Sequence, residues 1–212
     1  MSQRLTAYNY CRGVVFRGTA MIHLYDKIMG STSLTQPSSG SDLRRTDLIR
    51  TGVVLSVSAM DTYYTRRFVE LLIPFVKRKG VTERLAALLV DAGLDTKQAV
   101  EMAMMKRPLR RLRSLLNRHL EKKVTQRFRV VDDLFLAYGI KDLTGHAEAA
   151  TGRKKLRASV EILVQRRHRI VHDGDLDSRG RLRQIRSEEM LRRIEDMCKL
   201  VDASEEILNR IV

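Results

Sequence analysis

Tryptophan is absent from the 212-residue sequence, and proline, cysteine and aromatic residues are scarce: it has three prolines, two cysteines and 5% aromatic side chains. Residues that form helices readily, such as leucine, alanine, methionine, arginine and glutamate, are common instead. This composition favours an all-α fold, because few residues are present that would interrupt helices. We predict an up-and-down bundle of about five main helices with short accessory helices and one sizeable core.

Several patterns that mark common enzyme classes are also missing. The chain has no GxxxxGK[ST] or GxGxxG loop and no GxSxG turn, so nucleotide-phosphate binding and serine-hydrolase chemistry have no basis. His146 has no cysteine or second histidine at metal-ligand spacing, and we expect no metal site and no cofactor. Cys11 and Cys198 lie far apart in helical patterns, and we predict that both are reduced core residues.

Long apolar segments are missing as well. The first ten residues, MSQRLTAYNY, lack an apolar stretch of signal-peptide length. No uncharged apolar run is long enough to span a bilayer. We therefore expect a cytoplasmic protein with no membrane partner.

Positive charge is in large excess: 40 lysines and arginines face 25 acidic residues, and the formal net charge is +15. Such an excess attracts polyanions, so nucleic acid is the expected partner, and a basic surface that only confers solubility is the alternative. The densest run lies between Lys106 and Arg129, with ten basic residues and one glutamate. A solvated helix face usually mixes charges of both signs, and we therefore predict that Arg111, Arg118 and Lys122 bind RNA.

Helix-breaking residues divide the chain into an N-terminal helix, a loop and a main helical region. We predict the N-terminal helix within residues 1–29. The segment 30–41 is rich in serine, glycine and threonine and cannot build a core, so we predict a flexible loop there. Residues 42–212 then form the main helical region, and the whole chain is expected to be one domain.

A long central helix opens the main region. Asp42 is its expected N-cap, the stretch 48–60 is apolar on almost every side, and Pro74 should kink or end it. Residues 141–152 are predicted as a loop with a short helical tendency. We expect the remaining helices, from their apolar periodicity and capping residues, at 82–93, 96–106, 107–124, 127–139 and 153–174, and from the capping residue Ser187 onward. The methionines at the end of the predicted helix 96–106 are expected to fill the core, with an adaptable binding surface as the alternative, namely Met102, Met104 and Met105.

The predicted helix 153–174 carries an unusual cluster at its end. Gly174 stops the helix, and the cluster before it contains five cationic or titratable residues, namely Arg166, Arg167, His168, Arg169 and His172. Cations so close together repel one another, and histidine can titrate near neutral pH, so the cluster indicates chemistry. A solvated helix end whose histidines interact with the helix dipole is the alternative.

Arg167 and His172 stand in an arginine, four residues, histidine arrangement, with His168 directly after the arginine. This arrangement resembles the motif of the HEPN-domain ribonucleases. The earlier segment VSAMDTYYTRRFVELL also resembles these domains, because many of them carry an acidic residue in this helix and an aromatic residue two positions later. Asp61 and Tyr63 occupy those two positions here.

The resemblance covers roughly residues 48–212, is closest to the RiboL-PSP type of HEPN domain, and implies an HEPN-like helical bundle with metal-independent endoribonuclease activity. In this activity the 2′-OH of RNA attacks the adjacent phosphate and leaves a 2′,3′-cyclic phosphate. The resemblance assigns catalysis to Arg167, His168 and His172. It gives Asp61 a contact that supports Arg167, and a solvent-facing carboxylate is the alternative. It also implies a toxin or antiphage defence role.

The chemistry of this cleavage requires a base, an acid and a cation beside the phosphate. His172 can transfer a proton near neutral pH, and Arg167 can bind the phosphate. On an ideal helix these two side chains project about 140° apart, so both reach one phosphate only if the helix distorts or another chain contributes. His168 and His172 share one face of the helix. Because HEPN nucleases dimerise so that two motifs share a cleft, we expect a homodimer.

The remaining expected partners follow from the charge and the resemblance. Arg166 and Arg169 are predicted to bind the RNA backbone beside the motif. An antitoxin or a defence-system protein is a further candidate partner. HEPN toxins that pair with a nucleotidyltransferase antitoxin have tyrosine two positions after the histidine, where this chain has Gly174. The alternative function is a non-catalytic HEPN-like module that binds RNA, nucleotide or a protein, and no helix-turn-helix supports a DNA-binding regulator.

Overall fold

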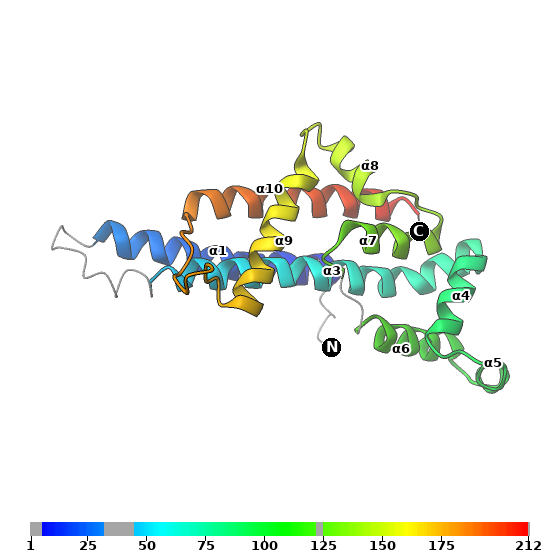
Figure 1. The fold of residues 1–212 in the computed structure, drawn as a ribbon. Coiled ribbons are helices and arrows are strands. Elements are labelled where there is room, and N and C mark those ends of the chain that lie inside the picture. The colour runs from blue at the N-terminus through cyan, green and yellow to red at the C-terminus, as the bar shows by residue number, and fades with distance from the viewer. Residues whose placement is uncertain (1–5, 32–44, 122–124, 212) are drawn as a thin grey trace.

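Helix α3, Asp47–Lys79, runs through the length of the molecule, and the other helices pack around it (Figure 1). The computed structural model describes residues 6–31, 45–121 and 125–211. These ranges contain nine α-helices, one short 3₁₀ helix and no strand, so the predicted all-α fold is confirmed. The other elements are α1 Ala7–Ser31, α4 Glu83–Asp91, α5 Thr96–Ala103, α6 Pro108–Leu120, α7 Phe128–Phe135, η1 Leu136–Tyr138, α8 Leu143–Ala150, α9 Leu156–Asp173 and α10 Ser187–Asn209.

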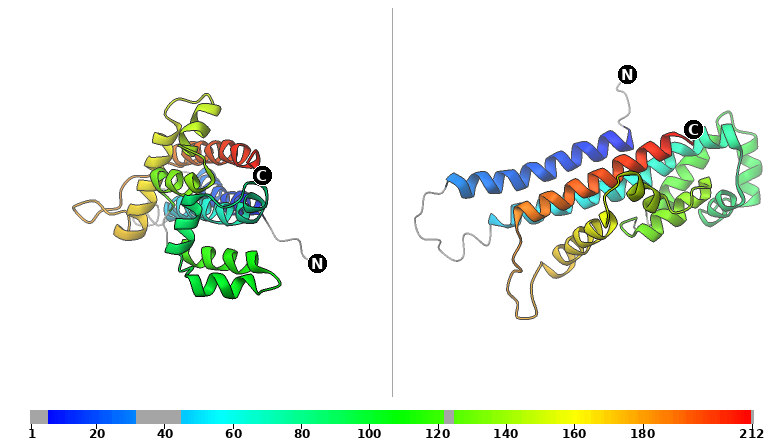
Figure 2. Two further views of the ribbon diagram at one scale, coloured as in Figure 1. Left: turned by 90° about the vertical axis from the view of Figure 1, so that its right-hand side faces the viewer. Right: turned by 90° about the horizontal axis from the view of Figure 1, so that it is seen from above.

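The long helices α1 and α10 lie along α3, and α9 crosses beside them, as the views in Figures 1 and 2 show. The buried residues of α3 spread over a wide face of the helix, so several neighbouring helices can cover it. The short helices α4, α5 and α6 gather around the C-terminal half of α3. None of the helices in the described ranges combines the length and the apolar character that a membrane span requires.

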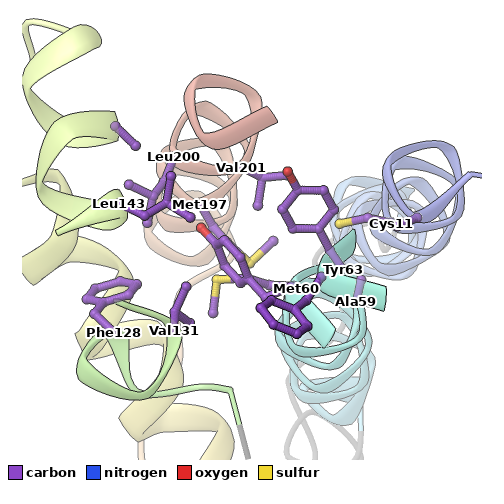
Figure 3. Close-up of a cluster of buried hydrophobic side chains, with 14 of the residues drawn as sticks. Cys11, Ala59, Met60, Tyr63, Phe128, Val131, Leu143, Met197, Leu200 and Val201 are labelled. Atoms are coloured by element: carbon purple, nitrogen blue, oxygen red, sulfur yellow. The ribbon is translucent and has the colours of Figure 1, made fainter. Parts of the chain in front are cut away.

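Part of the hydrophobic core lies between α1, α3, α7, α8 and α10, as Figure 3 shows. It contains Cys11 of α1, Met60 and Tyr63 of α3, Val131 of α7, Leu143 of α8 and Met197 of α10. The hydroxyl group of Tyr63 donates a hydrogen bond to Glu205 Oε2 at 2.9 Å, so the buried phenol has an acceptor. Burial raises the pKa of the Cys11 thiol to about 12. Cys11 and Cys198 are both free thiols, as predicted.

Two glycines face each other where α1 packs on α3. A Cβ atom at Gly18 would lie 2.8 Å from the carbonyl oxygen of Gly52 and 2.6 Å from Oγ of Ser56. A Cβ atom at Gly52 would lie 2.6 Å from the carbonyl oxygen of Gly18. Separations this short are repulsive, so a larger residue at either position would force the two helices apart. The close approach of α1 and α3 therefore depends on both glycines.

The prediction for Pro74 is that it kinks or ends the central helix, and α3 does not end there. It continues through Pro74 to Lys79. Leu72 and Phe75, on either side of the proline, are buried, and their packing offsets the cost of about 3 kcal/mol of a proline within a helix. Asp42, the expected N-cap, and most of the predicted loop 30–41 lie outside the described residues.

Three predictions about individual helices can be compared with the structure. The segment 141–152, predicted as a loop with a short helical tendency, contains helix α8 over most of its length, because the Asp142 side chain caps the helix by accepting a hydrogen bond from the backbone N–H of Gly145. Ser187 is the first residue of α10, and its side chain makes no capping hydrogen bond, because the cap position belongs to Arg186. Thr82 caps α4 through its side chain, as predicted.

The predicted burial of all three methionines is also wrong. Met102 is buried, whereas Met104 is 87% exposed and Met105 is 44% exposed. Helix α5 ends at Ala103, so the residues after it no longer follow the helical face that points at the core.

We predict that Gly18→Ala lowers the free energy of unfolding by about 1–3 kcal/mol, because the added methyl group collides with the α3 backbone. Gly13→Ala is the matched control on the same helix, since nothing lies within 4 Å of a Cβ atom there. The control should gain about 0.5–1 kcal/mol from the better helix propensity of alanine. Urea unfolding followed by circular dichroism measures both, and equal stabilisation of the two variants would contradict the glycine contact.

Candidate functional site

The C-terminal end of α9 presents two different faces. Leu156, Val160 and Leu163 are fully buried, and Arg167 follows Leu163 by one helical turn on the same side. The Nε atom of Arg167 is buried and has no hydrogen-bond partner within the described ranges. Arg167 thus continues the side of α9 that packs on the bundle, where a guanidinium N–H without an acceptor is unfavourable.

His168 and His172 lie on the exposed side of α9. They are one turn apart, and their imidazole rings are in contact, with centroids 4.3 Å apart and planes inclined by 43°. In the part of the chain that the structure describes, no three histidine, cysteine, aspartate or glutamate side chains gather in a way that could hold a metal ion. One chain therefore brings the two histidines together and directs Arg167 to another side of the helix.

A buried carboxylate, Asp175, holds the end of α9 against α3. Its Oδ2 atom accepts hydrogen bonds from Nε of Arg50 at 2.9 Å and from Nη2 of Arg166 at 2.7 Å. Asp175 is fully buried, and the side chain of Arg50 is only 6% exposed. Both arginines also donate to the carbonyl oxygen of Arg183, at 2.8 and 3.4 Å. Arg50 and Arg166 thus share one buried carboxylate. The carbonyl oxygen of Arg183 is a further acceptor that helps to replace the water that both guanidinium groups lose on burial.

The chain reaches Asp175 through a left-handed turn directly after α9. Gly174 and Asp175 have φ angles of 61° and 60°. Their backbone N–H groups both donate to the carbonyl oxygen of Arg169. Glycine adopts this conformation freely, and aspartate tolerates it better than most residues. The predicted stop at Gly174 is confirmed, and the turn is what brings Asp175 back to α3.

The loop after this turn is held by its own hydrogen bonds. The Oδ1 atom of Asp177 accepts from the backbone N–H groups of Arg179 and Arg181, at 2.8 and 2.9 Å. The hydrogen bond from Arg181 is the main cause that lowers the pKa of the Asp177 carboxyl group. Together with the end of α9, the loop encloses a hollow of about 880 Å³, and Arg169 lines this hollow.

The other end of α9 is held by a second buried carboxylate. Asp196 of α10 is 1% exposed. It accepts hydrogen bonds from Nη2 of Arg153 at 3.0 Å and from Oγ of Ser159 at 2.6 Å. Buried, paired carboxylates thus fix α9 at both ends, so the histidines stand on a firmly held helix.

The structure gives Asp61 different partners from the predicted one. Its Oδ1 atom accepts hydrogen bonds from the backbone N–H of Thr125 at 2.7 Å and from the hydroxyl of Thr125. Its Oδ2 atom accepts from Nε2 of Gln126 at 3.2 Å. Asp61 lies eleven residues along α3 from Arg50, or about 16 Å, and so about three turns away from the contact of Arg50 with Asp175. Within the described part of one chain, Asp61 therefore joins α3 to the start of α7 and makes no hydrogen bond to Arg167.

The predicted RNA-binding arginines fall into two groups. Arg166 pairs with the buried Asp175, which gives it a structural role, and its predicted contact with RNA stays a prediction. Arg169 makes no ion pair with any described residue and borders the hollow beside α9. Arg111 and Arg118 are exposed on α6, where they remain accessible to a ligand. Lys122, the fifth predicted RNA-binding residue, lies outside the described residues.

The sequence reasoning missed Arg50 and Asp175 as a pair. Arg50 is a charge within an otherwise apolar stretch of α3, and a charge in such a place requires a buried partner. That signal could have identified Arg50 as an anchor. Its partner could not have been chosen in the same way, because acidic residues are frequent after α9 and only the left-handed turn selects Asp175.

We predict that Asp175→Ala lowers the free energy of unfolding by about 3–5 kcal/mol, because it leaves Arg50 and Arg166 without their shared carboxylate. Asp173→Ala is the control, since Asp173 is exposed at the end of α9 and has no ion pair with the described residues. Urea unfolding should separate the two variants clearly. A similar, small effect of both substitutions would show that the buried network does not stabilise the fold.

Comparison with protein-family models, with curated proteins and with solved structures gives no match to this chain. The resemblance to the HEPN ribonucleases therefore rests on the motif residues themselves.

Proposed function

We propose that this protein is a metal-independent endoribonuclease of the HEPN type that works as a homodimer. The observation that carries the proposal is the exposed contact pair His168 and His172 at the end of α9, one residue from Arg167. Cleavage by the 2′-OH of RNA requires groups that transfer protons and a cation at the phosphate; the two accessible imidazoles supply the first, and Arg167 of a second chain supplies the cation. No other cluster in the described part of the chain combines these three groups.

The local charge balance supports a ligand that is an anion. Asp175, a buried acid that follows the motif in the sequence, already accepts hydrogen bonds from Arg50 and Arg166. Arg167 and Arg169 have no carboxylate partner among the described residues. A phosphate diester supplies the acceptors that these guanidinium groups lack, and it lowers the repulsion between the neighbouring cations.

The contact between the two histidines is the argument for a dimer. The attacking 2′-oxygen and the leaving 5′-oxygen lie on opposite sides of the phosphorus atom, roughly in line. Rings whose centroids are 4.3 Å apart lie together on one side of such a phosphate. A second motif that faces the first across a cleft supplies a proton donor on the other side, and it brings Arg167 of one chain toward His172 of the other. Arg169 and the hollow beside it then bind the neighbouring backbone.

A toxin or antiphage defence role is the biological setting that we propose for such an activity. An RNase with a strongly basic surface and no cofactor requirement would damage cellular RNA unless it is controlled. A protein antitoxin or a defence-system partner that covers the end of α9 would provide that control.

We predict that the wild-type protein cleaves RNA in the presence of EDTA and leaves 2′,3′-cyclic phosphate ends. His172→Ala should reduce the rate by about a hundredfold or more, because proton transfer by a positioned side chain contributes that much. His146→Ala is the matched control, since His146 is exposed on α8, outside the motif. Fragment-end analysis on total and synthetic RNA gives the answer. Loss of wild-type activity in EDTA would contradict the mechanism, and binding without cleavage would favour the non-catalytic alternative.

We also predict that two inactive variants complement each other. Mixing Arg167→Gln protein with His172→Ala protein should recover part of the wild-type activity, because a mixed dimer contains one intact pairing of Arg167 with His172 across the cleft. The measurement is the cleavage rate after subunit exchange, with each variant alone as the control. No recovery in a sample shown to contain mixed dimers, or full activity in a stable monomer, would contradict the shared site.

A further inference from the structure

Besides the end of α9, a second group of arginines surrounds a groove that Asp61 also lines. The groove lies between α3 and α6, encloses about 780 Å³, and is lined from α3 by residues between Asp61 and Glu70 and from α6 by residues between Arg110 and Leu120. Figure 1 shows α6 beneath the C-terminal half of α3, running back along it. Helix α6 has 13 residues and is about 20 Å long, so the groove is elongated and suits an extended ligand.

Four arginines line this groove, namely Arg66, Arg110, Arg113 and Arg118. None of them makes an ion pair with a residue in the described ranges. The guanidinium of Arg66 lies over the ring of Tyr10, 4.1 Å from the ring centroid, so α1 helps to fix its position. On α6, Arg110 and Arg113 are neighbours about one turn apart, whereas Arg118 follows Arg113 by five residues and projects about 140° from it, so the three arginines border the groove at different places.

Three carboxylates also line the groove, and each already accepts a hydrogen bond from the protein. Asp61 accepts from Thr125 and Gln126, as described above. Glu70 accepts from the backbone N–H of Ala7 at 2.9 Å, and Glu121 accepts from Nδ2 of Asn117 at 2.8 Å. The acidic groups therefore have internal partners, whereas the arginines keep their donors available for a ligand.

The lining indicates which part of a nucleic acid would bind. It contains no aromatic side chain, so bases have no ring to stack on. Arginine forms strong bidentate hydrogen bonds with phosphate oxygens. The groove thus suits a phosphate backbone and carries no means of reading sequence.

We infer that the groove between α3 and α6 binds the backbone of single-stranded RNA, as a second contact remote from the end of α9. The choice of RNA rests on the proposed function, because in-line attack by the 2′-oxygen needs a strand free to rotate about its backbone. The groove holds the substrate without selecting its sequence, and Arg66, Arg110, Arg113 and Arg118 supply the phosphate contacts. Arg111 is not among the residues that line the groove.

The experiment measures RNA binding in the His172→Ala background, where cleavage is expected to be at least about a hundredfold slower. Fluorescence anisotropy with a labelled oligouridylate of about 12 nucleotides, over a series of salt concentrations, gives the affinity and its salt dependence. Arg110→Gln/Arg113→Gln should weaken binding and reduce the slope of log affinity against log salt by about 1.4, since each lost single-strand phosphate contact contributes about 0.7. Lys77→Gln/Arg78→Gln is the control, because it removes the same charge from the exposed end of α3.

The inference stands if Arg110→Gln/Arg113→Gln reduces the slope of log affinity against log salt and the control does not. Arg110→Lys/Arg113→Lys should retain most of that slope, because it keeps both positive charges. It is overturned if both double variants lose the same slope, if neither does, or if the His172→Ala protein binds no RNA. Failure of the proposed nuclease activity can be told apart from failure of the groove inference. If only the nuclease proposal fails, the wild-type protein cuts no RNA, while the groove variant still shows a reduced salt dependence of binding.

Discussion

The shared hydrogen bonds of Asp175 with Arg50 and Arg166 are the contact on which the geometry of the motif depends. A buried carboxylate between two guanidinium groups is stable only when all three are held together, since removal of one leaves an uncompensated charge. This contact fixes the last turn of α9 on α3 and orders the loop that borders the motif. Because Asp175 already accepts hydrogen bonds from Arg50 and Arg166, and Arg167 and Arg169 have no carboxylate partner among the described residues, the motif keeps an excess of positive charge.

The position of α3 makes this contact possible. Its apolar surface is covered by α1 and α10, and the Gly18 to Gly52 contact lets α1 approach closely. The same helix carries Arg50 near one end and Asp61 in the middle, so it meets α9 at one place and the start of α7 at another. One rigid helix thus positions the end of α9 and one wall of the α6 groove.

The end of α9 and the groove between α3 and α6 are both rich in arginine, but they differ in the side chains that accompany the arginines. At the end of α9, imidazoles and guanidinium groups lie within two turns of one helix, which suits bond cleavage at a phosphate. In the groove between α3 and α6, four arginines from two helices line the wall and no histidine does, which suits retention of a strand. The proposals therefore place catalysis and substrate holding on separate surfaces.

Local rules explain what the sequence by itself determined about this protein. Apolar periodicity, the Thr82 cap and the stop at Gly174 depend on residues a few positions apart, so the all-α fold, most helices and the shared face of His168 and His172 could be predicted. The partners of Asp61 and Arg50 are 64 and 125 residues away in the sequence. No local pattern selects such partners, because they depend on how the helices cross and on the turn after α9. Only the tertiary structure decided that Arg166 is an anchor, that Asp61 joins α7, and that α3 and α6 enclose a groove.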